Sequence, residues 1–161
     1  MVRYSVTVLL FILLLCNSLN AREWLIEPGT GLGWITINLH TKEYMLKNIG
    51  TPDDIKVNGG DVYYVYASYG FILIFNGSDE RLSRIVVTGS RYKTSKGFHV
   101  GSAIGTAMIF YPEGNLFKSL RMYVCNRTGV TFCYNDSSKK ITSIIIHSQI
   151  YGERDIDQKG E

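Results

Sequence analysis

The segment YYVYASYGFILIFNGSDERLSRIVV, residues 63–87, decides the fold because it has the pattern of three strands joined by two turns. A second segment, MYVCNRTGVTFCYNDSSKKITSIII at 122–146, has the same order of apolar runs and turns. At a shift of 59 residues, Gly70 falls on Gly129. Apolar runs that flank a glycine-containing turn are typical of antiparallel hairpins. The sequence therefore predicts two copies of a three-stranded meander, repeated in tandem.

A short helix is predicted ahead of each meander. In the first half, Thr41 is a suitable N-cap and Gly50 supplies the left-handed end. In the second half, Ser102 is the candidate cap of a helix that ends before Pro112. Gly105 weakens this second helix by about 1 kcal/mol relative to alanine. We expect an α+β fold of two tandem helix-plus-three-stranded-meander units, an antiparallel sheet with its helices on one face.

The glycine-rich segment GTGLG at residues 29–33 raises the alternative of a phosphate-binding loop. Its spacing matches neither the dinucleotide motif nor the Walker motif. The following WITINL is typical of a strand, whereas a phosphate loop needs the N-terminus of a helix at that point. We therefore interpret these glycines as a turn between two strands.

The first 21 residues have the pattern of a secretory signal peptide. One cation, Arg3, precedes an apolar run at 6–15, and a polar stretch ends in Ala21. The run is shorter than the roughly 20 residues that span a bilayer, which disfavours an uncleaved membrane anchor. Cys16 leaves a lipid anchor open, although Leu15 stands where lipoprotein signals carry a small residue. We expect export, either to the periplasm and cell envelope or out of the cell.

After this segment, residues 22–88 form the first predicted unit, 89–151 the second, and 152–161 a polar tail. The apolar content of 45% is sufficient for a core. Removing Arg3 with the signal lowers the formal charge from +3 to +2, a balance that does not indicate nucleic-acid binding. Three sequons, at Asn76, Asn126 and Asn135, are interpreted as turn chemistry rather than as glycosylation sites.

Cys125 and Cys133 remain in the exported chain, where a disulfide is chemically permitted. A two-residue turn at Arg127 and Thr128 would set Cys125 opposite residue 130 and Cys133 opposite residue 122. The thiols would then lie on opposite faces and could not bond. A three-residue turn would bring them to one face, so the sequence leaves the disulfide open.

The capped helix in NLHTKEYMLKNIGTPD, residues 38–53, and the YG pair at Tyr69 and Gly70 support a comparison with a known group. Together with the meanders, this pattern resembles the SmpA/OmlA (BamE-like) envelope domains and the beta-lactamase inhibitory proteins built from two such units. The resemblance implies a sheet covered by helices on one face and a non-catalytic role in the envelope or outside the cell. It also implies that the exposed sheet face binds a partner protein. The segment GTAMIFYPEG at 105–114 departs from the pattern because it lacks a charged helix face.

Catalytic and metal-binding motifs are missing from the sequence. His40, His99 and His147 are scattered, and a metal shared by His40 and His99 is far less favoured than two equivalent surface histidines. Cys125 could pair with a histidine as a nucleophile, but a packed or disulfide-bonded cysteine is the simpler interpretation of this residue. We expect no cofactor, no metal and no enzyme activity, and we hold a small hydrolase as the least favoured alternative.

The chain contains 11 tyrosines, and several of them fall within the predicted hairpins. On an open sheet face they make good anchors for a partner protein, although strand alternation would place half of them in the core. A basic stretch near the join adds charge that suits an acidic partner or anionic lipid. The candidate partner-binding residues are Tyr64, Tyr66, Tyr69, Tyr123, Arg91 and Lys93.

The predicted function is non-enzymatic binding of another protein in the envelope or outside the cell. Two alternatives stay open, a secreted inhibitor of an enzyme and a structural envelope component tethered by lipid at Cys16. Peripheral or lipid-anchored contact with a membrane is compatible with each of them.

Overall fold

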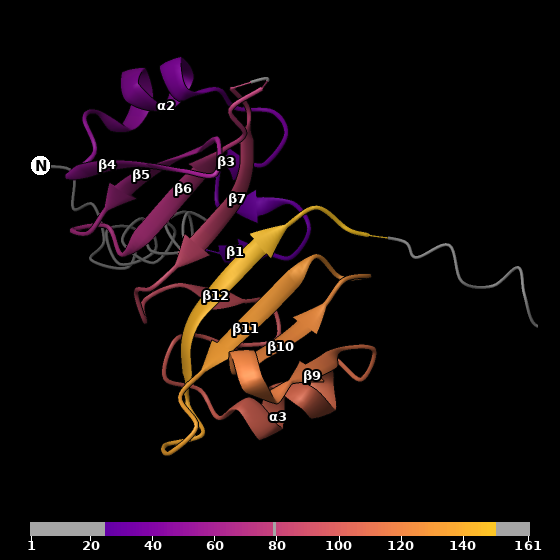
Figure 1. The fold of residues 1–161 in the computed structure, drawn as a ribbon. Coiled ribbons are helices and arrows are strands. Elements are labelled where there is room, and N and C mark those ends of the chain that lie inside the picture. Colours follow the sequence, from indigo (N-terminus) through magenta and orange to yellow (C-terminus); the bar gives the residue numbers. More distant parts are fainter. Residues whose placement is uncertain (1–24, 79, 151–161) are drawn as a thin grey trace, which may run out of the picture.

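The computed structural model describes residues 25–78 and 80–150, which form mostly β-sheet (Figure 1). The first part of the chain contains strands β1 (Leu25–Glu27), β2 (Gly31–Leu32) and β3 (Ile35–Thr36), helix α2 (Lys42–Ile49), and strands β4 (Asp54–Asn58), β5 (Asp61–Tyr66), β6 (Phe71–Phe75) and β7 (Leu82–Val87). The second part contains strand β8 (Lys93–Thr94), helix α3 (Ile104–Phe110), strand β9 (Asn115–Phe117), the 3-10 helix η2 (Lys118–Leu120), and strands β10 (Met122–Cys125), β11 (Val130–Tyr134) and β12 (Ile141–His147).

The strands form two sheets. The larger has eight strands in the order β4-β5-β6-β7-β12-β11-β10-β9, and all of its neighbours are antiparallel. Its centre is the pairing of β7 with β12, where Val87 lies opposite Ile144 and Ile85 opposite Ile146. The smaller sheet has four strands in the order β3-β2-β1-β8, and β8 runs parallel to β1.

This topology shows that the predicted fold class, two tandem units of a helix and three strands, is wrong. Strands β4 and β9 lie at the outer edges of the large sheet, so four strands follow each helix. The chain also exchanges elements across the predicted boundary, because β8 from the second part pairs with β1 from the first. Separate units would leave the backbone groups of β7 and β12 as open sheet edges, and their pairing removes that cost.

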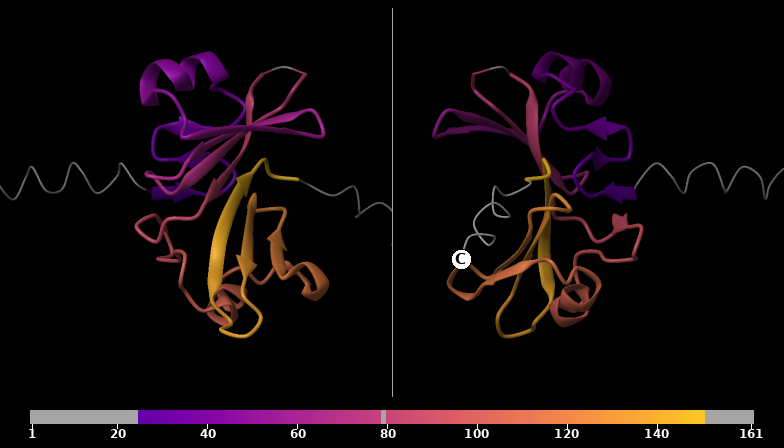
Figure 2. Two further views of the ribbon diagram at one scale, coloured as in Figure 1. Left: turned by 60° about the vertical axis from the view of Figure 1, so that its left-hand side comes forward. Right: turned by 90° about the vertical axis from the view of Figure 1, so that its right-hand side faces the viewer.

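One hydrophobic core joins both parts of the chain. The two helices contribute Met45, Ile104 and Ala107 to it, and the large sheet contributes fully buried residues such as Leu73 and Phe132. In both views of Figure 2, the small sheet and the two helices lie on the same side of the large sheet. The opposite face of the large sheet is left uncovered by these elements, which makes it the place to look for a binding site.

Local capping signals explain one helix better than the other. The predicted start of α2 is confirmed, since the Thr41 hydroxyl accepts a hydrogen bond from the amide of Tyr44 at 3.3 Å. Gly50 ends this helix with φ +98°. The predicted cap of α3 is wrong, because Ala103 occupies the N-cap position without a side-chain bond. The Ser102 hydroxyl instead accepts from the amide of His99 at 3.0 Å.

The glycine-rich segment is a turn between strands, as interpreted from the sequence. Strands β1 and β2 pair as an antiparallel hairpin around it. The amide of Gly29 donates to the carbonyl of Gly129 at 3.0 Å, which ties this hairpin to the turn between β10 and β11. Gly129 has φ +75°, and a Cβ there would lie 2.5 Å from the Cα of Gly29.

Candidate binding groove on the open sheet face

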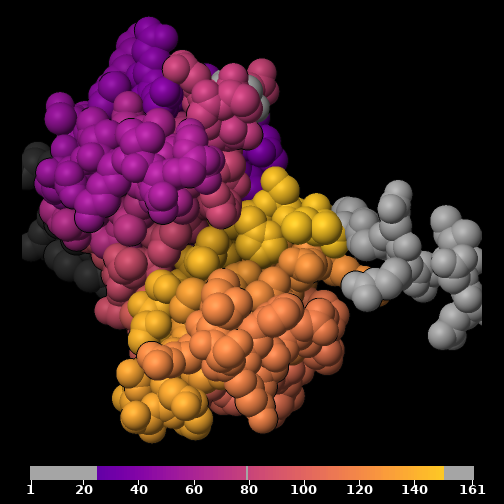
Figure 3. All heavy atoms as spheres, in the orientation of Figure 1, coloured from indigo at the N-terminus to yellow at the C-terminus, as the bar shows by residue number. Residues whose placement is uncertain are grey.

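A groove of about 520 Å³ crosses the uncovered face of the large sheet at its centre. In Figure 3 the yellow β12 lies between the magenta and the orange parts of the molecule, along the line of this groove. Residues from both parts of the chain line it: Asp61, Asn76, Ser83, Arg84, Met122, Asn126, Thr131, Ile145, His147, Ser148 and Ile150. The β7–β12 pairing thus creates a site that neither part contains alone.

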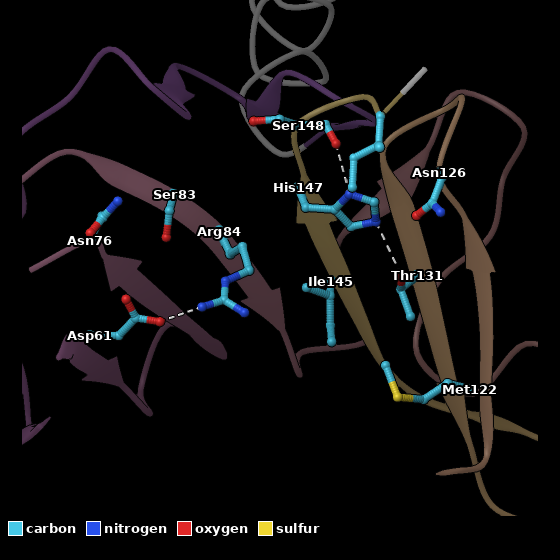
Figure 4. A pocket seen from close by; sticks show the side chains of 11 residues that line it. Asp61, Asn76, Ser83, Arg84, Met122, Asn126, Thr131, Ile145, His147 and Ser148 are labelled. Carbon is cyan, nitrogen blue, oxygen red and sulfur yellow. Dashed lines mark hydrogen bonds and ion pairs between the residues drawn. The ribbon is translucent and has the colours of Figure 1, made fainter. Parts of the chain in front are cut away.

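Strand alternation explains which residues reach the groove. Ile144 and Ile146 of β12 are fully buried, so Ile145 and His147 point to the opposite, open face. The antiparallel register then places Arg84 of β7 opposite His147, and Thr131 of β11 opposite Ile145. Figure 4 shows Asp61 and Arg84 on one side of Ile145, with Thr131 and Met122 on the other.

The charge in the groove is an ion pair. The guanidinium of Arg84 on β7 donates from Nη2 to Oδ2 of Asp61 on β5. The pair therefore spans the intervening strand β6. Both side chains stay partly exposed, so the pair contributes little to stability. It holds the guanidinium plane over the groove, and the remaining N–H groups of the fork suit a carboxylate oxygen or a peptide carbonyl.

His147 has a defined hydrogen-bond arrangement. Its Nδ1 lies 2.9 Å from the backbone carbonyl of Ser148, which can only accept, so we infer that Nδ1 carries the proton. Its Nε2 lies 3.1 Å from the hydroxyl of Thr131, which donates to this nitrogen in the tautomer that carries its proton on Nδ1. Thr131 is only 3% exposed although it lines the groove, and its hydroxyl contacts the imidazole.

The lining as a whole combines an apolar floor with a polar rim. Met122, Ile145 and Ile150 supply apolar surface. The amides of Asn76 and Asn126 and the hydroxyls of Ser83 and Ser148 surround it. An apolar contact area with a few convergent polar groups is the usual composition of a binding site.

Most of the tyrosines predicted as partner anchors lie in the core instead. Tyr64, Tyr66 and Tyr123 are buried, so their placement on an exposed face is corrected. Burial is also the main reason why the pKa of Tyr66 rises to about 12. The Tyr66 hydroxyl donates to the carbonyl of Gly50 at 2.9 Å, and the Tyr123 hydroxyl donates to the carbonyl of Tyr111. The three tyrosines lie on the covered face of the sheet, and the hydroxyls of Tyr66 and Tyr123 are used in hydrogen bonds to backbone carbonyls.

The other predicted partner-binding residues are exposed but lie outside the groove. Tyr69 is 41% exposed, and the guanidinium of Arg91 donates to its carbonyl at 2.6 Å. Lys93 is exposed in β8, opposite Leu25 of β1. The structure therefore brings Tyr69 and Arg91 together and leaves Lys93 apart from the groove.

Strand alternation gives a partial signal for the groove residues. Arg84 belongs to the basic residues near the predicted join, and His147 is one of three histidines that are scattered in the sequence, so nothing local connects them. The relevant signal was their position next to the apolar alternation of Ile85, Val87, Ile144 and Ile146. Their meeting across β7 and β12 depends on a pairing between distant segments, which that pattern does not contain.

The two described cysteines are free thiols. Cys125 lies opposite Val130 and Cys133 opposite Met122, the register expected for a two-residue turn. They therefore point to opposite faces of the sheet, which closes the open disulfide question. Burial raises the pKa of Cys125 to about 12, with a smaller contribution from the charge of Glu113. A thiol with that pKa stays protonated near neutral pH and is a poor nucleophile.

The three histidines have three different surroundings. His40 stacks on Tyr44 with ring centroids 4.4 Å apart, and burial lowers its pKa. His99 lies beside Ser102, and His147 lies in the groove. Within residues 25–78 and 80–150, His, Cys, Asp and Glu form no group of three or more that could hold a metal ion.

Several sequence-based expectations fall outside the described part of the chain. They are the signal peptide at 1–21, the lipid anchor at Cys16 and the polar tail at 152–161. Among the residues that are described, no helix is both long and apolar enough to cross a membrane.

Comparisons with known proteins give a fold relationship and no family. No protein-family model matches the sequence, and no curated protein matches it. An extracellular protein with an SCP domain from Bacillus anthracis superposes with a TM-score of 0.54 at 10% identity, over 67% of this chain and 43% of that one. The chain thus corresponds to less than half of that protein's length.

Two further solved structures give weaker superpositions. The uncharacterised protein yfeY from Escherichia coli has a TM-score of 0.47 at 16% identity, over 78% of this chain and 99% of that one. A cysteine-rich secretory protein from Staphylococcus aureus has a TM-score of 0.47 at 15% identity, over 80% of this chain and 49% of that one.

These findings overturn the resemblance to SmpA/OmlA domains and beta-lactamase inhibitory proteins. A protein that contains an SCP domain is among the solved structures that superpose on this chain, and the architecture is an eight-stranded sheet with a separate four-stranded sheet. The resemblance relied on a capped helix and a glycine-containing turn. Both are local features that many β-rich folds share.

Proposed function

We propose that this protein is an exported, non-enzymatic protein-binding module and that its binding site is the groove at the β7–β12 pairing. The observation that carries the proposal is a groove on the uncovered sheet face with an apolar floor, a polar rim and an oriented guanidinium. The signal-like segment at 1–21 supports export. The description of the Bacillus anthracis neighbour as extracellular agrees with it.

The arrangement of His147 supports binding rather than catalysis. A hydroxyl that donates to a histidine whose other nitrogen is oriented by an acceptor resembles an activated nucleophile. Here the hydroxyl belongs to Thr131, which is only 3% exposed, and the group at the other ring nitrogen is the carbonyl of Ser148 rather than a carboxylate. We therefore assign the Thr131–His147 pair to positioning the imidazole at the groove.

The ligand that suits the groove is an extended segment of another protein. Asparagine and serine side chains along the rim can pair with peptide N–H and C=O groups. Ile145 and Ile150 offer contact for one apolar side chain, and Arg84 offers a donor to an acidic one. If the partner is an enzyme that loses activity in a stoichiometric complex, the protein is a secreted inhibitor. Lipid on Cys16 would instead indicate a tethered envelope component.

Site-specific photocrosslinking tests this proposal. The full chain is made in its native cells with the photoreactive residue p-benzoylphenylalanine in place of Ile150 in the groove or Ile55 on β4. The two positions are matched in exposure, at 55% and 52%. We expect a discrete crosslink to another protein from position 150, weakened by Arg84→Ala, and none to another protein from position 55. Crosslinks to another protein from both positions, or from position 55 alone, would contradict the groove as the binding site.

A further inference from the structure

Strand β4 is an open edge of the large sheet. It has five residues, all of them exposed, and among the described residues it pairs with β5 alone. Folded proteins usually protect such an edge by keeping it short, or with a proline, a bulge or a charge. β4 contains no proline, and its register with β5 runs without a shift. The opposite edge of the sheet, β9, has three residues and leads directly into η2. β4 is therefore the longer of the two open edges.

The turn between β4 and β5 fixes which backbone groups of β4 stay unpaired. Two glycines, Gly59 and Gly60, form this turn, and their φ values of +60° and +89° are typical of type I′. Asn58 and Asp61 lie opposite each other on either side of it. The residues that close a two-residue turn bond to each other, and every second pair along the ladder does the same. The even-numbered residues of β4 therefore direct their backbone groups to β5, and the odd-numbered residues direct theirs away from the sheet.

The side chains of β4 divide between the two faces of the sheet. Ile55 lies opposite Tyr64, which is buried on the covered face, and Val57 follows on that face. Ile55 and Val57 nevertheless stay 52% and 71% exposed. Asp54 and Lys56 alternate onto the open face, where the Lys56 ammonium lies 3.4 Å from the Asp54 carboxylate. A lysine alone would guard the edge against pairing, but here an acid two residues away offsets its charge.

We propose that β4 pairs with β4 of a second copy of the chain, antiparallel about a two-fold axis, with Ile55 opposite Ile55. In this register the outward backbone groups of the two Ile55 residues bond to each other. Asp54 of each copy then lies opposite Lys56 of the other, which forms two ion pairs between the strands. Centring the axis on Lys56 would set two lysines opposite each other, and centring it on Val57 would set Lys56 opposite Asn58 without a charge pair.

The order of charges along β4 favours a second copy over an unrelated strand. With an acid at position 54 and a lysine at position 56, the strand is complementary to itself when it is reversed. The pairs between copies would join the pair already present within each strand, which places four alternating charges on the open face. On the covered face, the two Ile55 side chains would shield each other from water.

This pairing would extend the large sheet across two copies and leave both grooves open. The groove lies at the β7–β12 pairing, whereas β4 is the outermost strand. Because the two-fold axis is perpendicular to the sheet, both open faces point the same way, and a partner with two binding segments would meet two grooves at once. Two five-residue strands bury less area than a standard interface, so we expect a dimer that dissociates on dilution. The dimer itself does not depend on the groove having a ligand.

Analytical ultracentrifugation with charge-reversed variants tests the pairing. The protein is purified from cells that export it and measured up to about 1 mM, which detects millimolar dissociation constants. Asp54→Lys and Lys56→Asp should each weaken the dimer about tenfold, because like charges then lie opposite each other. An equimolar mixture of the two variants should restore it, since each strand again meets its opposite. The double variant Asp54→Lys/Lys56→Asp should also dimerise like the unaltered chain, and circular dichroism checks that every variant is folded.

Disulfide trapping tests the register. Opposite residues of a bonded pair have Cα atoms about 5.5 Å apart, so Ile55→Cys should give a disulfide-linked dimer under mild oxidation. Val57→Cys is the matched control, because the two positions 57 would lie about 13 Å apart along the strands. The unaltered chain controls for Cys125 and Cys133, and the photoreactive residue at position 55 should join two copies into a product of twice the mass.

Several outcomes would overturn this dimer. They are a monomer at every concentration, a dimer that is indifferent to the charge reversals, variants that do not rescue each other, and trapping at position 57 that equals trapping at position 55. A monomer whose position 55 crosslinks to a different protein would show that the edge receives a foreign strand instead. A failed dimer would leave the groove untouched, because the groove is tested by crosslinks to another protein from position 150.

Discussion

A contact between two glycines joins the N-terminal hairpin to the large sheet. The carbonyl of Gly129 accepts from the amides of both Gly29 and His147, at 3.0 and 3.1 Å. The turn can approach this closely only without a side chain, because a Cβ on Gly129 would lie 2.5 Å from the Cα of Gly29. The left-handed φ of +75° adds a second requirement for glycine at the same residue.

Gly129→Ala should therefore destabilise the protein through two separable effects, the strain of the left-handed backbone and the clash with Gly29. Gly97 has φ +85° and no atom within 4 Å of its Cβ position, so it provides the control for backbone strain alone. We expect Gly97→Ala to cost about 1 kcal/mol of the free energy of unfolding. Gly129→Ala should cost about 2 kcal/mol more, because the backbone of Gly29 must move. Urea unfolding measures both, and equal losses would show that the Gly29 contact is unimportant.

At the scale of the element, α2 is specified by residues within and next to itself. The Thr41 hydroxyl satisfies a free amide of the first turn, and Glu43 and Lys47 complement the helix dipole. Helix α3 has no side-chain cap and no charged residue in its end turns. Its position depends on the burial of Ile104 and Ala107 against the core. Tertiary packing rather than a local signal therefore determines where α3 begins, and the sequence placed its cap one residue too early.

The capping bond of α2 should be measurable in isolation. We expect Thr41→Ala to lower the free energy of unfolding by about 1 kcal/mol, because the amide of Tyr44 loses its acceptor. Thr41→Ser keeps the hydroxyl and should remain close to the unaltered protein. Thermal unfolding of the three proteins compares them directly. A loss in the serine variant as large as in the alanine variant would mean that the threonine methyl, rather than the hydrogen bond, stabilises this turn.

At the scale of the whole molecule, the pairing of β7 with β12 joins two parts of the chain into one sheet. Ile85 and Ile146 lie opposite each other there and are fully buried. The backbone bonds and the core are both continuous across this line. We therefore expect the described chain to unfold as one cooperative unit. The two units predicted from the sequence, with their boundary between residues 88 and 89, would instead allow two separate unfolding transitions.

Truncation of Ile146 tests this cooperativity. Ile146→Ala should cost about 3 kcal/mol through lost burial and the cavity left behind. In native-state hydrogen exchange, the amides of β5 and β6 should lose as much protection as those of β10 and β11. Ile150→Ala, at an exposed position, should change little. Loss of protection confined to β10 and β11 would instead favour two separately unfolding units.

The groove illustrates why a site can be less predictable than the elements that build it. Alternation in β12 shows that Ile145 and His147 share a face, and alternation in β7 shows that Arg84 lies opposite in orientation to Ile85. Neither pattern shows which face the helices and the small sheet will cover. The same gap explains the tyrosines, since Tyr64 and Tyr66 share a face that proved to be the covered one.

The sequence by itself determined the local features: the strands around the turns at Gly70 and Gly129 and the two ends of α2. These features depend on turn chemistry, capping and hairpin geometry, which act over a few residues. Only the tertiary structure decided the pairing of β7 with β12 and of β1 with β8. Such pairings join segments that lie about 60 residues apart or more. Their backbone bonds are the same for any two strands, so the competition among all exposed edges and apolar faces selects the partners.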